Sequence, residues 1–183
     1  MRIVAGTARG RRIEAPPGRD VRPTTDRVRE ALFNSLGSLG VVEGARVIDL
    51  FAGSGALGLE ALSRGAAHVT FVEQDRRAAN VVRRNLDTLG FTDRALVVDD
   101  DALVWLSGAP AAALMLCDPP YAFDGWPDLL AASPAPLVVA ESDRSIEPPD
   151  GWELVRTKRY GTTVVTIVAR SAPNLPPTTE PPE

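Results

Sequence analysis

The sequence predicts an α/β fold in which a mostly parallel sheet of seven strands ends in an antiparallel hairpin and follows a small N-terminal β-hairpin and a helix. From residue 46 onward, short apolar runs alternate with stretches of helical periodicity, which is typical of a parallel sheet covered on both faces. Two further strand-like runs near the C-terminus are separated by Tyr160-Gly161, which is hairpin spacing. The 183 residues, 44% of them hydrophobic, suffice for one such domain.

The N-terminal segment predicts the hairpin and the helix that precede the sheet. Residues 2–5 and 11–15 are expected to form short strands around a glycine-bounded turn, and the Pro-Pro-Gly stretch at residues 16–18 ends the hairpin. A helix should begin at residues 23–25 and end at Gly37, because apolar residues recur between them at helical spacing.

Strands and helices are expected to alternate along residues 46–141, before the final hairpin. The predicted strands are residues 46–51, 68–73, 95–98, 111–117 and 136–141. The predicted helices are residues 56–64, 75–89, 102–106 and 126–132. The hairpin consists of residues 152–159 and 162–170. We therefore expect three segments, namely a basic arm at 1–22, an α/β domain at 23–170 and a disordered, Pro-rich tail at 171–183.

The charge of the chain is unevenly distributed. The net charge is −4 and the pI about 5.1, values that by themselves argue against a nucleic-acid partner. However, residues 1–29 contain eight arginines and only three acidic residues, so a basic segment precedes an acidic body. Such a segment is typical of contact with a polyanion, and the alternative is a solvated arm without a partner. The arginines that we assign to this contact are Arg2, Arg9, Arg11, Arg12, Arg19, Arg22 and Arg27.

The sequence disfavours several classes of protein. No apolar run is long enough to span a bilayer and the N-terminus lacks the apolar stretch of a secretory signal, which predicts a cytoplasmic protein with no membrane partner. Cys117 is the only cysteine and lies in an apolar run, so we interpret it as a core residue. No cluster of His, Cys or carboxylate residues has metal-ligand spacing in the sequence, and we expect no metal.

The carboxyl ends of the predicted parallel strands carry the candidate site residues, because ligands bind at these ends in a doubly wound sheet. The first strand leads into a tight turn, Asp49-Leu-Phe-Ala-Gly53-Ser-Gly55, whose glycines let a ligand approach the backbone at a helix start. The second strand ends at Glu73, the usual position of a carboxylate that binds two ribose hydroxyls. The third ends in Asp99-Asp100-Asp101 and the fourth in Asp118-Pro-Pro-Tyr121.

The glycine turn also matches G-x-G-x-x-G at Gly53, Gly55 and Gly58, the pattern of nicotinamide-dependent dehydrogenases. Asp49 counts against that class, because its negative charge would lie close to a pyrophosphate. His68, the only histidine, lies at the wrong end of its strand to relay a proton. An acidic residue shortly before the glycines suits a cofactor with a cationic amino-acid portion, and therefore predicts S-adenosylmethionine.

These motifs resemble a known family. Asp49 to Gly55 with Glu73 resembles the cofactor site of class I (Rossmann-like) S-adenosylmethionine-dependent methyltransferases. D/N-P-P-Y/F after strand four is the signature of members that methylate exocyclic or planar amino groups. The stretches MRIVAGTARGRRI, RPTTDRVREALFNSLG and VIDLFAGSGALGLEALSRGA extend the resemblance, over about residues 1–170, to the bacterial 16S rRNA guanine-N2 methyltransferases.

The resemblance implies a class I methyltransferase fold, an activity and a partner. The methyl group of S-adenosylmethionine would pass to the N2 amine of guanine 966 in 16S rRNA and leave S-adenosylhomocysteine. The N-terminal arm would recognise the RNA. The rRNA could be naked or part of a partly assembled 30S subunit, and we expect the protein to be a monomer.

The resemblance assigns cofactor-binding roles at several strand ends. Residues of the glycine turn would line the methionine and ribose portions, Glu73 would bind the ribose diol and Gln74 would flank the adenine. Asp101 and the Ala102 backbone would meet the adenine amine, with Asp99 and Asp100 left open for that role. Helix capping is the alternative for these loop carboxylates, and is our preferred interpretation of Asp75. The full cofactor set is Asp49, Phe51, Ala52, Gly53, Ser54, Gly55, Glu73, Gln74, Asp101, Ala102 and Asp118.

Residues 118–121, the DPPY loop, would hold the amine that is methylated. Asp118 would accept a hydrogen of the amine, and Pro119 and Pro120 would stiffen the loop without adding a competing N–H. Tyr121 supplies a ring on which a planar base can stack, and an ordinary turn is the alternative for the loop. Two other functions stay open: an amino methyltransferase for adenine N6 in DNA or for a protein glutamine, and a non-catalytic RNA-binding module that has kept a cofactor pocket.

Overall fold

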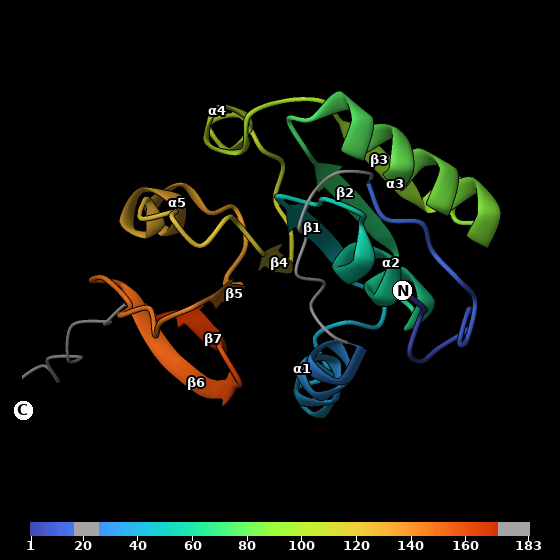
Figure 1. Cartoon of the computed structure of the whole chain (residues 1–183). Helices are drawn as coiled ribbons and strands as arrows, with labels where there is room; N and C mark the ends of the chain where they lie inside the picture. Colours follow the sequence, from blue (N-terminus) through green and yellow to red (C-terminus); the bar gives the residue numbers. More distant parts are fainter. Residues whose placement is uncertain (17–25, 172–183) are drawn as a thin grey trace, which may run out of the picture.

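The computed structural model describes residues 1–16 and 26–171, whose strands form a seven-stranded sheet in the order β3-β2-β1-β4-β5-β7-β6 (Figure 1). Strands β1 to β5 pair in parallel, whereas β7 is antiparallel to both β5 and β6. The strands are β1 (Arg46–Leu50), β2 (His68–Val72), β3 (Ala95–Val98), β4 (Leu114–Cys117), β5 (Leu137–Ser142), β6 (Trp152–Tyr160) and β7 (Thr163–Arg170). The predicted fold class, including the C-terminal antiparallel hairpin, is confirmed.

Helices cover both faces of the sheet. They are α1 (Asp26–Ser38), α2 (Ala56–Ser63), α3 (Arg76–Leu89), α4 (Ala102–Leu106) and α5 (Trp126–Ala132), with a 3-10 turn at Thr92–Arg94. Helices α1, α2 and α3 pack in one core that includes Leu116, and α4 and α5 pack in a second core that includes Met115. Successive residues of a strand point to opposite faces, which explains why these two neighbours belong to different cores.

Cys117 lies in the second core and is fully buried, as the sequence predicted for a core residue. Burial raises the pKa of its thiol well above the ordinary value, and the nearby carboxylates of Asp49 and Asp118 raise it further. The thiol is therefore protonated at neutral pH and is no nucleophile.

Among the helices of residues 1–16 and 26–171, none is both long and apolar enough to cross a membrane.

Most of the predicted elements differ from the observed ones by one residue or more at a boundary, and three of these differences have a physical reason. Strand β4 begins at Leu114, not at residue 111, because the preceding alanines offer little side chain to pack in a sheet. Helix α1 continues through Gly37, and the residue with positive φ beyond its end is Gly40, at 67°. Phe51 leaves β1 with a φ of 65° and begins the glycine turn. The predicted helix start, Arg19, Arg22 and most of the tail lie outside the described residues.

The N-terminal hairpin is smaller than predicted. Its two arms share one antiparallel bridge, Arg2 with Arg12, where the sequence predicted two strands of several residues. The reason is that the backbone N–H groups of Val4 and Ala5 donate to the carboxylate of Glu60 in α2, at 2.8 and 3.0 Å, and not to a partner strand. Ile3 and Ile13 are buried in the core with α1 to α3. The segment is therefore packed on the body and does not project from it.

Gly6 permits the closest approach of this segment to α2. Its φ is 81°, and a Cβ at this position would lie 1.9 Å from the carbonyl oxygen of Ser63. The next residue, Thr7, donates its N–H to the same oxygen at 2.8 Å. A larger residue at position 6 would push the segment away from the helix.

A buried ion-pair cluster joins the N-terminal segment, α1 and α2. Arg29 and Glu60 have no exposed side-chain surface, and the Arg29 Nε lies 3.5 Å from the Glu60 Oε2. Arg29 also donates to the carbonyl of Arg2 and pairs with Asp26 at 2.8 Å, while Arg64 pairs with Glu60 at 2.7 Å. The buried charges are thus paired across three segments that are distant in the sequence.

Candidate active site

The glycine turn places backbone groups at the carboxyl ends of β1 and β2. Gly53 and Gly55 have positive φ values of 57° and 79°, and Gly55 is the N-cap of α2. The N–H of Gly53 donates to the Glu73 Oε2 at 2.8 Å, and the other oxygen of Glu73 accepts the N–H of Asp75 at 2.9 Å. Glu73 therefore holds the turn in place as well as facing the cavity described below.

Gly58 allows helix α2 to pack closely on the sheet. Its N–H donates to the Asp49 Oδ2 at 2.8 Å. A Cβ at Gly58 would lie 2.3 Å from the Phe71 ring and 2.9 Å from the same Asp49 oxygen. The third glycine of the pattern is therefore required for the close approach of α2 to β1 and β2, and not for contact with a phosphate.

Asp49 is a buried acid at the bottom of the site, with 1% of its surface exposed. Burial raises its pKa to about 8; the hydrogen bond from Gly58 lowers it in part and the negative charge of Glu73 adds to the rise. Asp49 is therefore mostly protonated at pH 7 in the free protein. A cation bound beside it would favour the ionised form.

The three aspartates after β3 have different environments. Asp99 pairs with Arg83 at 2.7 Å and does not line the cavity, whereas Asp100 and Asp101 do. One oxygen of Asp101 caps α4 by accepting the N–H groups of Leu103 and Val104, at 2.9 and 3.1 Å. Asp101 is thus both a helix cap and a wall of the cavity; its capping role is confirmed, and its contact with the adenine amine stays a prediction. Asp75 caps α3 through the N–H of Arg77 at 2.8 Å, which confirms its capping role.

The DPPY loop follows β4 and is braced by the hairpin of β6 and β7. The Tyr121 hydroxyl lies 3.2 Å from the hydroxyl of Thr163, at the start of β7. Arg144 donates to the carbonyls of Tyr121 and Phe123, at 3.4 and 3.1 Å. The ring of Phe123 packs edge-on against Phe51, with centroids 5.3 Å apart, so the loop also touches the glycine turn. Thr163 and Arg144 thus hold Tyr121, and Phe51 contacts Phe123, two residues further along the chain.

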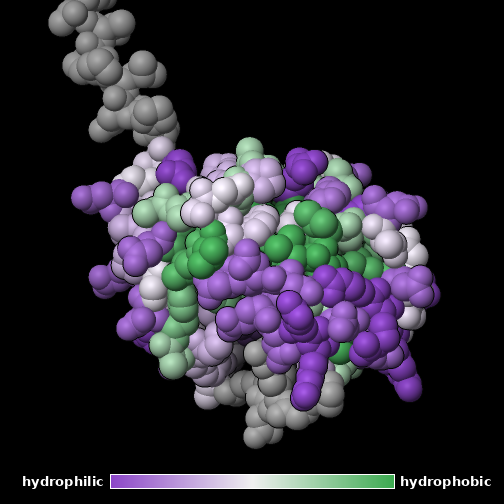
Figure 2. Space-filling view, turned by 90° about the horizontal axis from the view of Figure 1, so that it is seen from above, coloured by the Kyte–Doolittle hydropathy of each residue, from purple (hydrophilic) through white to green (hydrophobic). Residues whose placement is uncertain are grey.

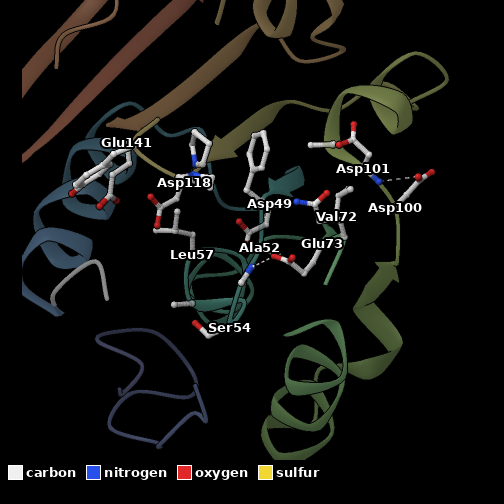
Figure 3. Close-up of a pocket in the computed structure, with 18 of the residues that line it drawn as sticks. Asp49, Ala52, Ser54, Leu57, Val72, Glu73, Asp100, Asp101, Asp118 and Glu141 are labelled. Carbon is white, nitrogen blue, oxygen red and sulfur yellow. Dashed lines mark hydrogen bonds between the residues drawn. The ribbon is translucent and has the colours of Figure 1, made fainter. Parts of the chain in front are cut away.

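One cavity of about 380 Å³ joins these features (Figure 3). Figure 3 shows Asp118 and Glu141 at one end, Glu73, Asp100 and Asp101 at the other, and Asp49 between them. Every predicted catalytic and cofactor residue lines it except Gly55, which shapes the turn; these are Asp49, Phe51, Ala52, Gly53, Ser54, Glu73, Gln74, Asp101, Ala102, Asp118, Pro119, Pro120 and Tyr121. Asp100, which the prediction left open for the adenine contact, lines it as well, and the lining residues that the prediction did not include are Met1, Ala56, Leu57, Val72 and Glu141.

The arginines assigned to a polyanion differ in their surroundings. Arg2, Arg9, Arg12 and Arg27 are exposed. Arg11 is exposed as well, but its guanidinium donates to the carbonyls of Thr88 and Leu89 at the end of α3, where it stabilises the helix. Arg2, Arg12 and Met1 line a second hollow beside the N-terminus, and Met1 also lines the main cavity. The N-terminal segment thus borders the candidate site.

A cofactor with a cationic amino-acid part and a ribose fits the acidic groups of this cavity. Acids at the ends of β1 and β2 face a helix start and a glycine turn with open backbone, and the volume is within the usual range of small-molecule sites. With a mostly parallel sheet of this strand order, the site defines a class I S-adenosylmethionine-dependent methyltransferase, and its cofactor is S-adenosylmethionine.

Comparison with known proteins identifies the family. Residues 1–169 match the family model described as conserved hypothetical protein 95. The protein named ribosomal RNA small subunit methyltransferase D from Escherichia coli K12 is 38% identical over 187 residues, which cover 94% of this chain and 91% of that protein. Its namesake from Haemophilus influenzae is 35% identical over 177 residues, or 88% and 89% of the two chains. A hypothetical protein of known structure from Thermus thermophilus has a TM-score of 0.80 and 32% identity, covering 92% of this chain and 99% of its own.

The chain therefore belongs to the family that contains the ribosomal RNA small subunit methyltransferase D proteins. The resemblance drawn from the sequence is confirmed at the level of the family. The roles of individual residues stay predictions.

Cofactor affinity should depend on pH through Asp49. If Asp49 faces the cationic portion of S-adenosylmethionine, binding favours its ionised form, and below about pH 8 each binding event releases a proton from it. Affinity should then rise with pH by up to about tenfold per unit between pH 6 and 8, and level off above. Calorimetry on the wild type and on Asp49→Asn would measure this.

The Asp49→Asn variant is the control for the pH experiment. The amino group of the cofactor titrates in both proteins, so the contribution of Asp49 is the difference between the two curves. Parallel curves would show that Asp49 does not respond to the bound cation.

Proposed function

We propose that the protein transfers the methyl group of S-adenosylmethionine to the exocyclic N2 amine of a guanine in 16S rRNA, at position 966 by family resemblance. The observation that carries this proposal is the single cavity that joins the glycine turn and Glu73 to the DPPY loop. A cofactor and an acceptor amine can therefore meet in one cavity. The names of the Escherichia coli and Haemophilus influenzae relatives support rRNA of the small subunit as the substrate.

The DPPY loop suits an amine that is a weak nucleophile. The lone pair of N2 is delocalised into the guanine ring, so the amine must be aligned and its hydrogens must be accepted. Asp118 offers a carboxylate for this, and neither Pro119 nor Pro120 adds an N–H that would compete. S-adenosylmethionine, when bound, supplies an electrophilic methyl group on a sulfonium. The protein then accelerates the transfer mainly by positioning.

Tyr121 would stack on the flipped guanine. Stacking on an aromatic side chain is worth about 1–3 kcal/mol per base. Extrusion of a base costs a few kcal/mol, so the stack offsets much of that cost. The hydroxyl contact with Thr163 holds the ring in a fixed place before the base arrives.

The surface near the cavity suits RNA. Seen from above, from the side that carries α4 in Figure 1, hydrophobic side chains gather between hydrophilic ones (Figure 2). Helix α4 starts at the cavity wall, and its residues Leu103 and Val104 are exposed. A single-stranded RNA segment offers apolar base faces to such exposed apolar side chains. Free rRNA or an assembling 30S subunit as the substrate, a monomeric state and a cytoplasmic location stay predictions.

Mass spectrometry of 16S rRNA nucleosides tests the proposed function. Purified protein is incubated with S-adenosylmethionine carrying a labelled methyl group and with undermethylated rRNA, both free and in small subunits. Labelled N2-methylguanosine at one position is expected. Label in adenine of DNA or in protein glutamine would favour the alternative amino methyltransferases, and no transfer to any of these would favour the non-catalytic RNA-binding module.

The exposed N-terminal arginines should contact phosphates. Replacing Arg2, Arg9 and Arg12 together by glutamine is expected to weaken RNA binding and to make the plot of log affinity against log salt shallower by about 2 units, at about 0.7 per phosphate contact of a single strand. Substitution is preferable to deletion, because the segment contributes Ile3 and Ile13 to the core. Filter binding at several salt concentrations measures the slope.

Arg46→Gln is the matched control for the arginine experiment. Arg46 is exposed at the amino end of β1, opposite the candidate site, so its loss should leave the salt slope unchanged. An unchanged slope in the triple variant would remove these arginines from the RNA interface.

A further inference from the structure

Glu141 is an acid of the cavity that no motif of the sequence pointed to. It lies in β5, is 4% exposed and lines the same cavity as Asp118 and Tyr121. Cys117 of β4 pairs with Ala140 of β5, so Asp118 and Glu141 are the next residues of two adjacent strands. Figure 3 shows both at the same end of the cavity, away from Glu73 and Asp101.

The position of Glu141 fits the acceptor base better than the cofactor. Glu73 and Asp101, the predicted ribose and adenine contacts, lie toward the other end of the cavity, and the DPPY loop lies beside Glu141. An ionised carboxylate has no donor and accepts hydrogen bonds only, and an N–H group of a bound ligand favours this form. A ligand that presents N–H groups to both neighbouring acids would therefore suit this end of the cavity.

The Watson–Crick edge of guanine presents such a set of donors. N1–H and the N2 amine lie side by side on this edge and point in the same direction. When Asp118 accepts a hydrogen of N2, the N1–H of the same base is the next donor along the edge. Adenine carries a lone pair on N1 instead, which a carboxylate repels.

We propose that Glu141 accepts the N1–H of the target guanine and thereby selects guanine over bases whose N1 carries no hydrogen. The inference rests on the proposed function, since it assumes a guanine in the cavity. Glu141 is then a specificity residue that reads the base, while Asp118 orients the amine that reacts.

A base analogue separates this role from a structural one. 2,6-Diaminopurine has the same N2 amine as guanine, but its N1 is an acceptor. The experiment compares 16S rRNA with guanine or with 2,6-diaminopurine at the target position, in the free or assembled form that the wild type methylates. The wild type should prefer guanine about 10- to 100-fold in kcat/KM.

Glu141→Gln should lose this preference. Its amide can turn its oxygen to the N1–H of guanine or its NH₂ to the N1 of 2,6-diaminopurine, so the ratio of the two kcat/KM values should approach one. Cofactor affinity should not change, because Glu141 lies at the other end of the cavity. Glu153→Gln, the same substitution at an exposed position of β6, should keep the wild-type ratio.

The outcomes distinguish the inference from the proposed function. Equal use of both bases by the wild type, or an unchanged preference in Glu141→Gln, overturns the role of Glu141 while guanine-N2 methylation stands. Failure of the wild type to methylate guanine overturns both. If Glu141→Gln does not fold, equal use of the two bases by the wild type still overturns the inference.

Discussion

Replacing Asp118 with alanine is expected to lower methyl transfer by about 10²- to 10³-fold, the range found when one preorganised group that hydrogen-bonds the reacting atoms in the transition state is removed. The cavity places the Asp118 carboxylate beside Tyr121 and Glu141, at the end away from Glu73. The lost acceptor acts on the amine as it attacks, so kcat should fall while cofactor affinity stays nearly intact. Single-turnover rates with labelled S-adenosylmethionine and calorimetric cofactor affinity measure the two effects separately.

Two further variants sharpen this test. Asp118→Asn keeps an oxygen acceptor, and the family signature allows Asn at this position, so its loss of rate should be smaller than that of Asp118→Ala. Asp124→Ala removes an exposed carboxylate from the segment just after the DPPY loop and should have no effect on the rate. A near-normal rate in Asp118→Ala would show that the amine loses its hydrogens elsewhere.

The strand-end part of the site could be predicted from the sequence because of a general property of parallel sheets. Their carboxyl ends lie along one edge, so Asp49, Glu73 and Asp118 had to lie near one another once the strands were recognised. Glu141 obeys the same rule at the fifth strand, which was also predicted. It was missed because no familiar motif accompanies it, although the strand-end rule alone would have found it.

The individual roles of the three aspartates could not be predicted, because their partners come from elsewhere in the fold. Asp99 forms an ion pair with Arg83 of α3, and Asp101 accepts hydrogen bonds from N–H groups of α4. A run of identical side chains contains no information about these neighbours. Only the tertiary arrangement distinguishes them.

The N-terminal segment shows the same limit for secondary structure. The sequence predicts two short strands around a glycine-bounded turn, but backbone donors of this segment bind side chains of α2. Glu60 could have indicated this contact with α2, because an acid in the middle of the apolar helix Ala56–Ser63 must find buried partners. Arg29 was counted only as part of a basic arm, whereas it is a fully buried partner of that acid.

Replacing Glu60 with alanine is expected to lower the free energy of unfolding by about 3–5 kcal/mol, the usual loss when one partner of a buried ion pair is removed. Arg29 would keep its buried charge without the carboxylate, and the N–H groups of Val4 and Ala5 would lose their acceptor. Urea unfolding followed by circular dichroism measures the change. Glu60→Gln should fall between the wild type and Glu60→Ala, because it keeps an acceptor for the amides but not the charge.

A control variant tests the size of the effect of Glu60→Ala, and a measurement of binding connects the ion pair of Glu60 to the candidate site. Glu30→Ala removes an exposed acid from α1 and should change the free energy of unfolding by no more than about 0.5 kcal/mol. Met1 lines the cavity at the end of the segment that Glu60 holds, so Glu60→Ala should also weaken binding at the site under conditions in which the protein is still folded. A loss below about 1 kcal/mol would mean that the core contacts of Ile3 and Ile13 hold the segment without the ion pair.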